Sequence, residues 1–185
     1  MDWGLPKPTS VIPSFLCRAQ DFPVSYKQAF HPNVYISAHE GREEEYGVDY
    51  IKKIAKQVPE CIFHIYGVYK DGYLGRELKN YFEGNIVWHG KVSNAKMNAE
   101  IKHFQCGLRL NSSDGFSEIT AKSILMGQYA ITRLRYPMIP NFETDRDLVS
   151  LLKSLRTMNK PNHAARNYYI NSLNRYPWVK AENFL

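Results

Sequence analysis

Residues 111–131 form the stretch of this chain with the clearest potential for chemistry. A short apolar run at 106–110 leads into a polar turn around Asp114, and a helix is expected from Ser117 to Gly127. A strand that enters a helix through such a turn gathers free backbone N–H groups and the positive end of the helix dipole, where a phosphate can bind. The same turn occurs in many α/β domains that bind nothing there, so phosphate binding and a purely structural turn both stay open.

Two histidines raise the question of a metal site, but the case for it is weaker than the case for phosphate binding. His39 and His89 fall at predicted strand ends, but no third ligand follows at a recognisable spacing, so no metal site is expected. Cys17, Cys61 and Cys106 are far apart and form no CxxC pair, which argues against a zinc site or a disulfide framework and fits a reducing cytoplasm.

Alternating strands and helices must position these residues. Apolar runs predict strands at 34–37, 61–66, 86–88, 106–110 and 129–132, and helical spacing predicts helices near 48–55, 74–82, 97–104, 117–127, 148–155 and 163–173. Strands separated by helix-length segments imply parallel pairing. We therefore expect a doubly wound, Rossmann-like α/β fold with a mostly parallel sheet, helices on both faces and ligands at the carboxyl ends of the strands.

Length and composition fit one such domain. The chain has 185 residues, of which 44% are hydrophobic, and its mean hydropathy is −0.44. Residues 1–32 contain five prolines and predict an extended lead-in or linker, whereas 33–185 carry the alternating pattern of the domain. No apolar run approaches the ~20 residues of a membrane span, and the N-terminus does not resemble a secretory signal.

A formal net charge of +6 favours anionic partners such as nucleotide phosphates, an anionic membrane face or nucleic acid. Much of the excess falls late in the chain, dispersed between Arg133 and Lys180, which is also what a solvated basic surface would look like. No RNA- or DNA-binding motif accompanies it, so a nucleic-acid partner is not expected.

Six fragments, in order, resemble the C-terminal, donor-binding domain of GT-B glycosyltransferases, in particular glycosyltransferase family 4 (group 1). The similarity covers nearly the whole chain from Val11 onward. The fragments are Val11-Ile-Pro, Tyr46-Gly-Val-Asp-Tyr-Ile preceded by Gly41-Arg42, Phe63-His-Ile-Tyr-Gly67, Ile86-Val-Trp-His-Gly90-Lys-Val, Asp114-Gly-Phe-Ser continued by Met126-Gly-Gln-Tyr-Ala-Ile131, and Tyr176-Pro-Trp178-Val.

This resemblance implies a nucleoside-diphosphate sugar as donor, transfer of the sugar to an acceptor hydroxyl, and no bound metal. It places the diphosphate near Arg42 and the amides of 115–117, because a guanidinium makes bidentate contacts to phosphate. It gives Asp114 the catalytic position, orienting the sugar. The donor-binding residues that it implies are Arg42, Gly67, Gly90, Lys91, Gly115, Phe116, Ser117, Glu118 and Lys122.

Two positions depart from the family pattern. A second glutamate is normally found eight positions after the first acid, but Lys122 stands there, and a lysine cannot accept hydrogen bonds from ribose hydroxyls. The family's diphosphate-binding lysine is replaced by Tyr46. Lys122 could bind phosphate or pair with Glu118 at i,i+4, and Arg42 could bind phosphate or pair with the acids at 43–45.

The resemblance also implies a missing half. GT-B enzymes carry the acceptor site on another domain of similar size, so a separate acceptor-domain chain is an expected partner. The alternative is a catalytically degenerate binding or scaffold module that acts with a partner chain. We expect a cytoplasmic protein, with peripheral association at a membrane as a further expectation.

Overall fold

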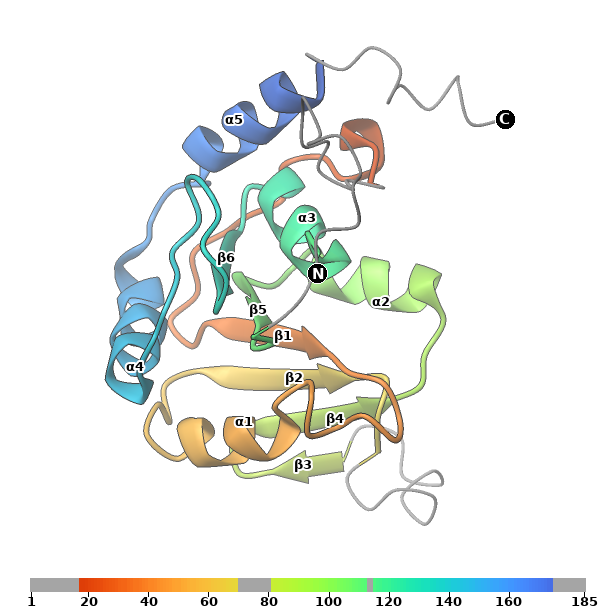
Figure 1. Ribbon diagram of the computed structural model, residues 1–185, viewed down its shortest axis with the longest axis vertical. Helices are drawn as coiled ribbons and strands as arrows, with labels where there is room; N and C mark the ends of the chain where they lie inside the picture. Colours follow the sequence, from red (N-terminus) through yellow and green to blue (C-terminus); the bar gives the residue numbers. More distant parts are fainter. Residues whose placement is uncertain (1–16, 70–80, 113–114, 175–185) are drawn as a thin grey trace, which may run out of the picture.

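The computed structural model describes residues 17–69, 81–112 and 115–174. A six-stranded sheet forms its centre, with the strand order β3-β4-β2-β1-β5-β6 (Figure 1). All neighbouring strands are parallel except β3, which runs antiparallel to β4 at one end of the sheet. The strands are β1 (Asn33–Ser37), β2 (Ile62–Tyr66), β3 (Tyr81–Glu83), β4 (Ile86–Gly90), β5 (Cys106–Arg109) and β6 (Tyr129–Thr132).

The parallel strands follow the doubly wound order. Along the sheet, the third, second, first, fourth and fifth parallel strands of the chain lie side by side. The direction of winding therefore reverses between β1 and β5, and in open α/β sheets ligands bind beyond the carboxyl ends of the strands at this reversal. The expected Rossmann-like fold with a mostly parallel sheet is confirmed.

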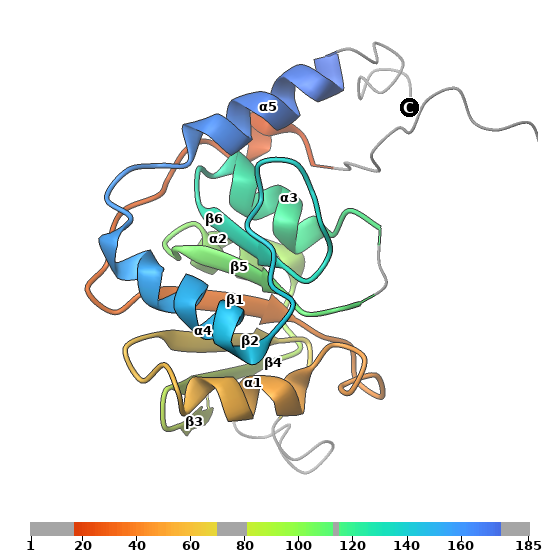
Figure 2. The same ribbon diagram turned by 60° about the vertical axis from the view of Figure 1, so that its left-hand side comes forward.

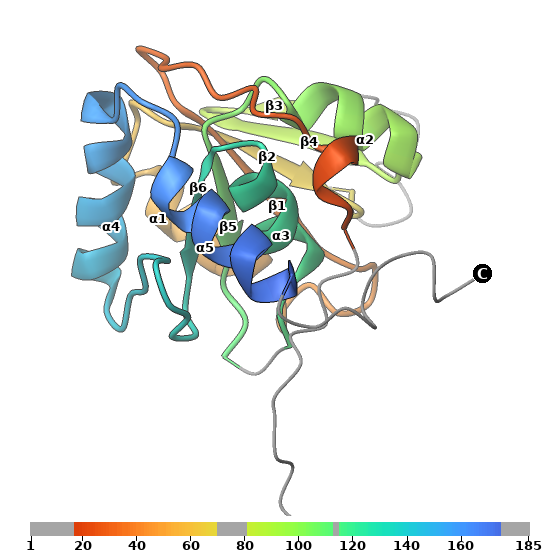
Figure 3. The same cartoon turned by 90° about the horizontal axis from the view of Figure 1, so that it is seen from above.

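Helices cover both faces of the sheet. Apolar side chains from α1 (Val48–Ala55) and α4 (Asp145–Ser154) join one core cluster, whereas those of α2 (Asn94–Ile101) and α3 (Glu118–Leu125) pack on the other face. Figure 3 shows α4 on one side of the strands and α2 and α3 on the other. The last helix, α5 (His163–Asn174), packs against the outside of α3.

Alternation along β1 explains how one strand serves both cores. Val34 and Ile36 join the cluster under α1 and α4, whereas Tyr35 between them faces α2 and α3. Its buried hydroxyl lies 2.7 Å from Ser123 Oγ on α3. Gly107 of β5 allows this close approach, because a Cβ there would overlap Ser123 Oγ and contact Ile119.

One expected helix is wrong where the structure describes it. Residues 81 and 82, placed by the sequence at the end of a helix over 74–82, belong to the edge strand β3 and pair with β4. The rest of that expected helix falls at 70–80, outside the described residues. A three-residue run carries too little periodicity to separate strand from helix, so only pairing with β4 decides its conformation.

Residues 17–32 cross the side of the domain before β1 begins. They contain one 3₁₀ turn, η1 (Ala19–Asp21), and otherwise run without regular structure. Tyr26 is buried, and its hydroxyl donates to Met158 O at 2.6 Å just after a second turn, η3 (Leu155–Thr157). The segment before the sheet is thus held against the segment that follows α4. Across the described ranges we find no helix with the length and apolarity of a membrane span.

Candidate functional site

A hollow of about 230 Å³ opens at the carboxyl edge of the sheet, at the reversal between β1 and β5. It lies beyond the last residues of the two strands, Ser37 and Arg109, and beside the first turn of α3. The lining comes from Ser37, His39, Tyr46, Asn94, Met97, Arg109, Ser117, Glu118, Ile119 and Lys122. Position and lining together make this hollow the candidate ligand site.

The start of α3 forms one wall of the hollow. Ser117 is the N-cap, and its Oγ accepts a hydrogen bond from Thr120 N at 3.2 Å. This capping satisfies one of the first amides of the helix and leaves other amides of the first turn for a ligand. Gly115 lies just before the cap, and its carbonyl accepts from Tyr136 Oη at 2.9 Å, which fixes the turn against the loop after β6.

Two guanidinium groups lie close to the ring of Tyr46. Arg109 stands 4.7 Å and Arg42 5.7 Å from the centre of its ring. Only Arg109 belongs to the lining of the hollow. A cation over an aromatic face is attracted by the ring, so Tyr46 holds Arg109 at the mouth of the site.

Lys122 contributes a second positive charge to the hollow. Its side chain is only 4% exposed, and Nζ lies 2.6 Å from Glu118 Oε1 and 5.8 Å from the ring of Phe22. The pairing of Lys122 with Glu118 is therefore present. Because the Glu118 side chain is 59% exposed, it can turn toward solvent and release the ammonium group to a bound anion.

Arg42 is paired elsewhere. Its guanidinium donates to the Glu45 carboxylate, with Nε 2.9 Å from Oε2, and both side chains are more than half exposed. The hydrogen bond to Glu45 raises the pKa of Arg42, and the same bond lowers the pKa of Glu45. Arg42 does not line the hollow, so its role in donor binding stays a prediction.

Three other predicted residues sit near the carboxyl edge with local partners. Gly67 has φ +89°, and a Cβ there would overlap Ala38 O. Gly90 has φ +62° and packs against the ring of Tyr69. Lys91 Nζ lies 2.6 Å from Glu40 Oε2. Backbone packing and an ion pair account for these positions, and none of the three lines the hollow.

His89 belongs to a chain of polar side chains inside the sheet rather than to the hollow. Its Nε2 lies 2.9 Å from His64 Nδ1, and His64 Nε2 lies 2.8 Å from Asn33 Oδ1. His89 Nδ1 is 3.5 Å from Glu100 Oε2 without the geometry of a hydrogen bond. Burial lowers the pKa of His64 to about 3 and also lowers that of His89. Among the described residues, no group of three or more His, Cys, Asp or Glu is arranged to hold a metal ion.

The remaining predictions divide into three groups. Ser117, Glu118 and Lys122 come together in the hollow. Gly115 lines a narrower space beside it, while Phe116 packs against Tyr136 and Tyr169. Asp114 lies outside the described residues.

Arg109 is the charged residue in the lining of the hollow that the sequence prediction missed. It is the last residue of β5, and charged residues at the carboxyl ends of parallel strands gather at one edge of the sheet. The position of Arg109 at the end of a strand was therefore the feature of the sequence that could have identified it as a site residue. The predicted strand extended to residue 110, which placed Arg109 inside the strand instead of at its end.

No protein-family model matches the chain, and no curated protein matches it in sequence. Solved structures do share its fold. The C-terminal domain of a glycosyl transferase group 1 family protein (LpcC) from Francisella tularensis has a TM-score of 0.56 at 11% identity, with 89% of this chain and 100% of that domain covered.

Two further structures are similar. A mutant of S. aureus TarM in complex with UDP and saccharide ligands has a TM-score of 0.57 at 13% identity, covering 83% of this chain and 34% of TarM. The lipopolysaccharide outer core galactosyltransferase WaaB has a TM-score of 0.52 at 19% identity, covering 91% of this chain and 55% of WaaB.

The match to whole enzymes is partial. This chain spans about a third of the length of the first glycosyltransferases that it matches. At these identities the likeness concerns the fold. The order of the strands and the structural neighbours agree on one conclusion: this chain has a Rossmann-like fold, which it shares with domains of solved glycosyltransferases.

Proposed function

We propose that this chain is the donor-binding half of a glycosyltransferase that takes a nucleoside-diphosphate sugar. The observation that carries the proposal is the hollow at the reversal of the sheet, which combines the start of a helix with two cationic side chains, Arg109 and Lys122. Such a combination suits a diphosphate, because amides and fixed cations both stabilise its charge.

In the proposed reaction, the bond between the sugar C1 and the β-phosphate oxygen breaks, and C1 forms a bond to an acceptor oxygen. The acceptor hydroxyl gives up its proton, and the nucleoside diphosphate leaves with an added negative charge. Arg109, Lys122 and the amides after Ser117 would stabilise that charge. No metal is proposed for this step.

Asp114 keeps its proposed place as the group that orients the sugar. Its neighbour Gly115 is held beside Arg109 in the narrower space next to the hollow. The acceptor site and the base that receives the proton are proposed to lie on a partner domain or chain. The short span of this chain relative to the enzymes that it matches supports this division.

One observation favours the alternative of a scaffold module without turnover. Glu118 and Glu45 already neutralise Lys122 and Arg42, and a ligand must displace Glu118 before it meets the ammonium group. A protein that no longer binds a nucleotide-sugar donor could keep these two ion pairs without losing any function. Binding of the nucleotide therefore separates the two functions.

Calorimetric titration with UDP, GDP and ADP, and with their sugars, tests the proposal. We expect one nucleotide series to bind and Arg109→Gln to weaken binding about tenfold or more, because a hydrogen bond to a charged group contributes about 1.5–3 kcal/mol. Arg42→Gln is the matched control, since both arginines contact Tyr46 but only Arg109 lines the hollow. Absence of binding across the panel would support the scaffold module. Equal losses in the two variants would move the site toward Arg42.

A further inference from the structure

The amino edge of the sheet, opposite the candidate donor site, carries a second surface with a chemistry of its own. It consists of the loops that enter β1, β2, β4 and β5 together with the last turn of α4 and the segment that follows it. In Figure 2 the β1 strand points to the right, so these loops lie on the left. Its basic residues are Lys27, Lys56, Lys102, Lys153, Arg156 and Lys160, and its acidic residues are Glu60 and Glu83.

No ion pair among the described residues neutralises the positive charge of the amino edge. All six basic side chains belong to exposed residues, and none has a carboxylate of the described residues within 4.0 Å. A cluster of like charges on one face repels itself, so it persists at little cost only where solvent or a negatively charged partner screens it.

An exposed aromatic ring stands among these cations. Phe30 is 73% exposed, more than any other large hydrophobic residue of the described chain. The Arg156 guanidinium lies 4.6 Å from its ring centre, and His31 contacts it edge to face at 4.8 Å. The ring is therefore held in place at the surface rather than folded into the core.

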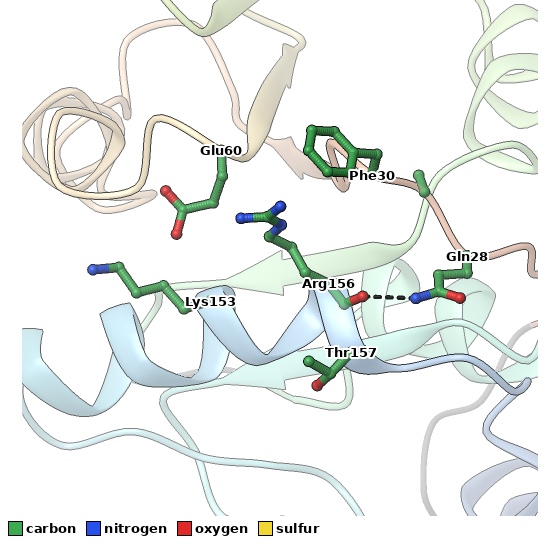
Figure 4. A pocket seen from close by; sticks show the side chains of 7 residues that line it. Gln28, Phe30, Glu60, Lys153, Arg156 and Thr157 are labelled. Carbon is green, nitrogen blue, oxygen red and sulfur yellow. Dashed lines mark hydrogen bonds between the residues drawn. The ribbon is translucent and has the colours of Figure 1, made fainter.

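A hollow of about 610 Å³ opens between the end of α4 and η3 on one side and the segment that carries Gln28 and Phe30 on the other (Figure 4). Lys153, Arg156 and Thr157 line one side, and Gln28 and Phe30 line the other, with Glu60 at the end. Gln28 Nε2 donates to Arg156 O at 2.7 Å, which fixes the two sides relative to each other.

We propose that the amino edge docks on an anionic lipid surface. Six separated cations can each meet a different headgroup, and the phenyl ring of Phe30 can enter the boundary between headgroups and acyl chains. Stable attachment of a peripheral protein needs two such signals together, apolar insertion and basic charge, and this edge presents both.

The same features fit nucleic acid less well. Binding to a single strand needs aromatic faces that are free for stacking, and the exposed ring of Phe30 already has the Arg156 guanidinium over it. The donor hollow opens at the opposite edge of the sheet. A chain docked through the amino edge therefore keeps that hollow open to water, and the two sites can be tested independently.

Vesicle co-sedimentation of the full chain tests the docking proposal. We expect binding to phosphatidylcholine vesicles that contain phosphatidylglycerol and no binding to pure phosphatidylcholine. The double variant Lys153→Gln/Arg156→Gln should bind about thirtyfold more weakly, because each basic residue near an anionic surface contributes about 1 kcal/mol. Phe30→Ser should weaken binding about tenfold through lost insertion of the ring.

The matched control is Arg133→Gln/Arg146→Gln, which removes the same charge from the residue after β6 and from the first turn of α4, both at the carboxyl edge. It should stay within about threefold of the parent, since salt screens distant charges. Unfolding midpoints confirm that every variant is folded. Equal loss in the control, equal binding to neutral vesicles, or tighter binding to random-sequence duplex DNA than to the anionic vesicles would each overturn the proposal.

Discussion

The two edges of the sheet carry the same kinds of basic side chains but surround them differently. At the carboxyl edge, Lys91 and Lys122 pair with glutamates at 2.6 Å, and Arg42 and Arg135 also donate to glutamates. At the amino edge, the six cations have no carboxylate partner among the described residues.

Because of this difference, the positive charges at the two edges can act on ligands in different ways. Paired cations at the carboxyl edge sit next to a hollow at the reversal of the sheet, where an anion must compete with a glutamate for each of them. Unpaired cations at the amino edge attract any anionic surface from a distance. Net charge alone therefore predicts neither site, because pairing decides which charges act outside the molecule.

The largest expected effect comes from reversing a charge at each edge. Lys122→Glu places a carboxylate at a position that is 4% exposed and beside Glu118, so it should destabilise the domain by about 3 kcal/mol. Lys153→Glu at the exposed amino edge should leave the unfolding midpoint near that of the parent. Urea unfolding measures both.

Lys122→Met distinguishes charge from packing at that position. It keeps most of the buried stem and leaves only the exposed Glu118 without its partner, so the loss should be less than about 1 kcal/mol. If Lys122→Glu proved as stable as the parent, the carboxyl edge would tolerate free charge as the amino edge does, and the contrast between them would fail.

A second prediction concerns His64 and His89, which form a chain of polar side chains with Asn33 inside the sheet. The pKa of His64 is lowered to about 3 by burial, with the neighbouring His89 as a smaller cause. A group whose pKa is lower in the folded state contributes stability that is present above the unfolded pKa of about 6.5 and is lost as the pH falls toward 3.

Between pH 7 and pH 5, His64 takes up a proton in the unfolded chain but not in the folded one. This difference should lower the free energy of unfolding by about 2 kcal/mol. His64→Asn should show a much flatter profile over the same window, measured by urea unfolding at each pH. An unchanged slope in that variant would assign the pH dependence to His89 or to groups at the surface.

The third prediction tests how the amino edge is held together. The hydroxyl of the buried Tyr26 donates to Met158 O at 2.6 Å, and removing it leaves a carbonyl without its partner. Tyr26→Phe should lose about 1 kcal/mol of stability and speed amide hydrogen exchange at 155–160. Tyr129→Phe removes a similar bond to Lys160 O at 3.0 Å, but this bond is exposed, so water replaces it and the loss should be smaller.

Much of the fold could be predicted from the sequence because its elements have strong local patterns. The apolar strand at 129–132 and the helix at 48–55 match β6 and α1, since period-two and helical spacing act over their whole length. The short run at 81–83 could not be assigned, because pairing with β4 rather than local pattern makes it a strand.

The candidate site was predictable only in part. Ser117 and Lys122 were found because they lie on one helix, where sequence spacing fixes their relation. Arg109 was missed, and the partner of Arg42 stayed open, because contacts between separate elements depend on the sheet order and on rotamers. For the same reason the late basic residues Lys153, Arg156 and Lys160 looked dispersed in the sequence, although the fold brings them to the same edge as three earlier lysines.

The smallest expected effect comes from releasing Arg42 at the carboxyl edge. Glu45→Gln removes the acceptor of an ion pair whose two side chains are more than half exposed, and water takes its place, so the unfolding midpoint should not change. The freed guanidinium stays next to Tyr46, which lines the hollow, and can turn toward an anion bound there. We therefore expect Glu45→Gln to bind nucleoside diphosphate more tightly than Glu44→Gln, which removes the same charge from the exposed neighbouring residue without freeing Arg42. Equal affinities by calorimetry would show that Arg42 stands too far from the ligand, and that Arg109 and Lys122 alone supply the positive charge of this edge.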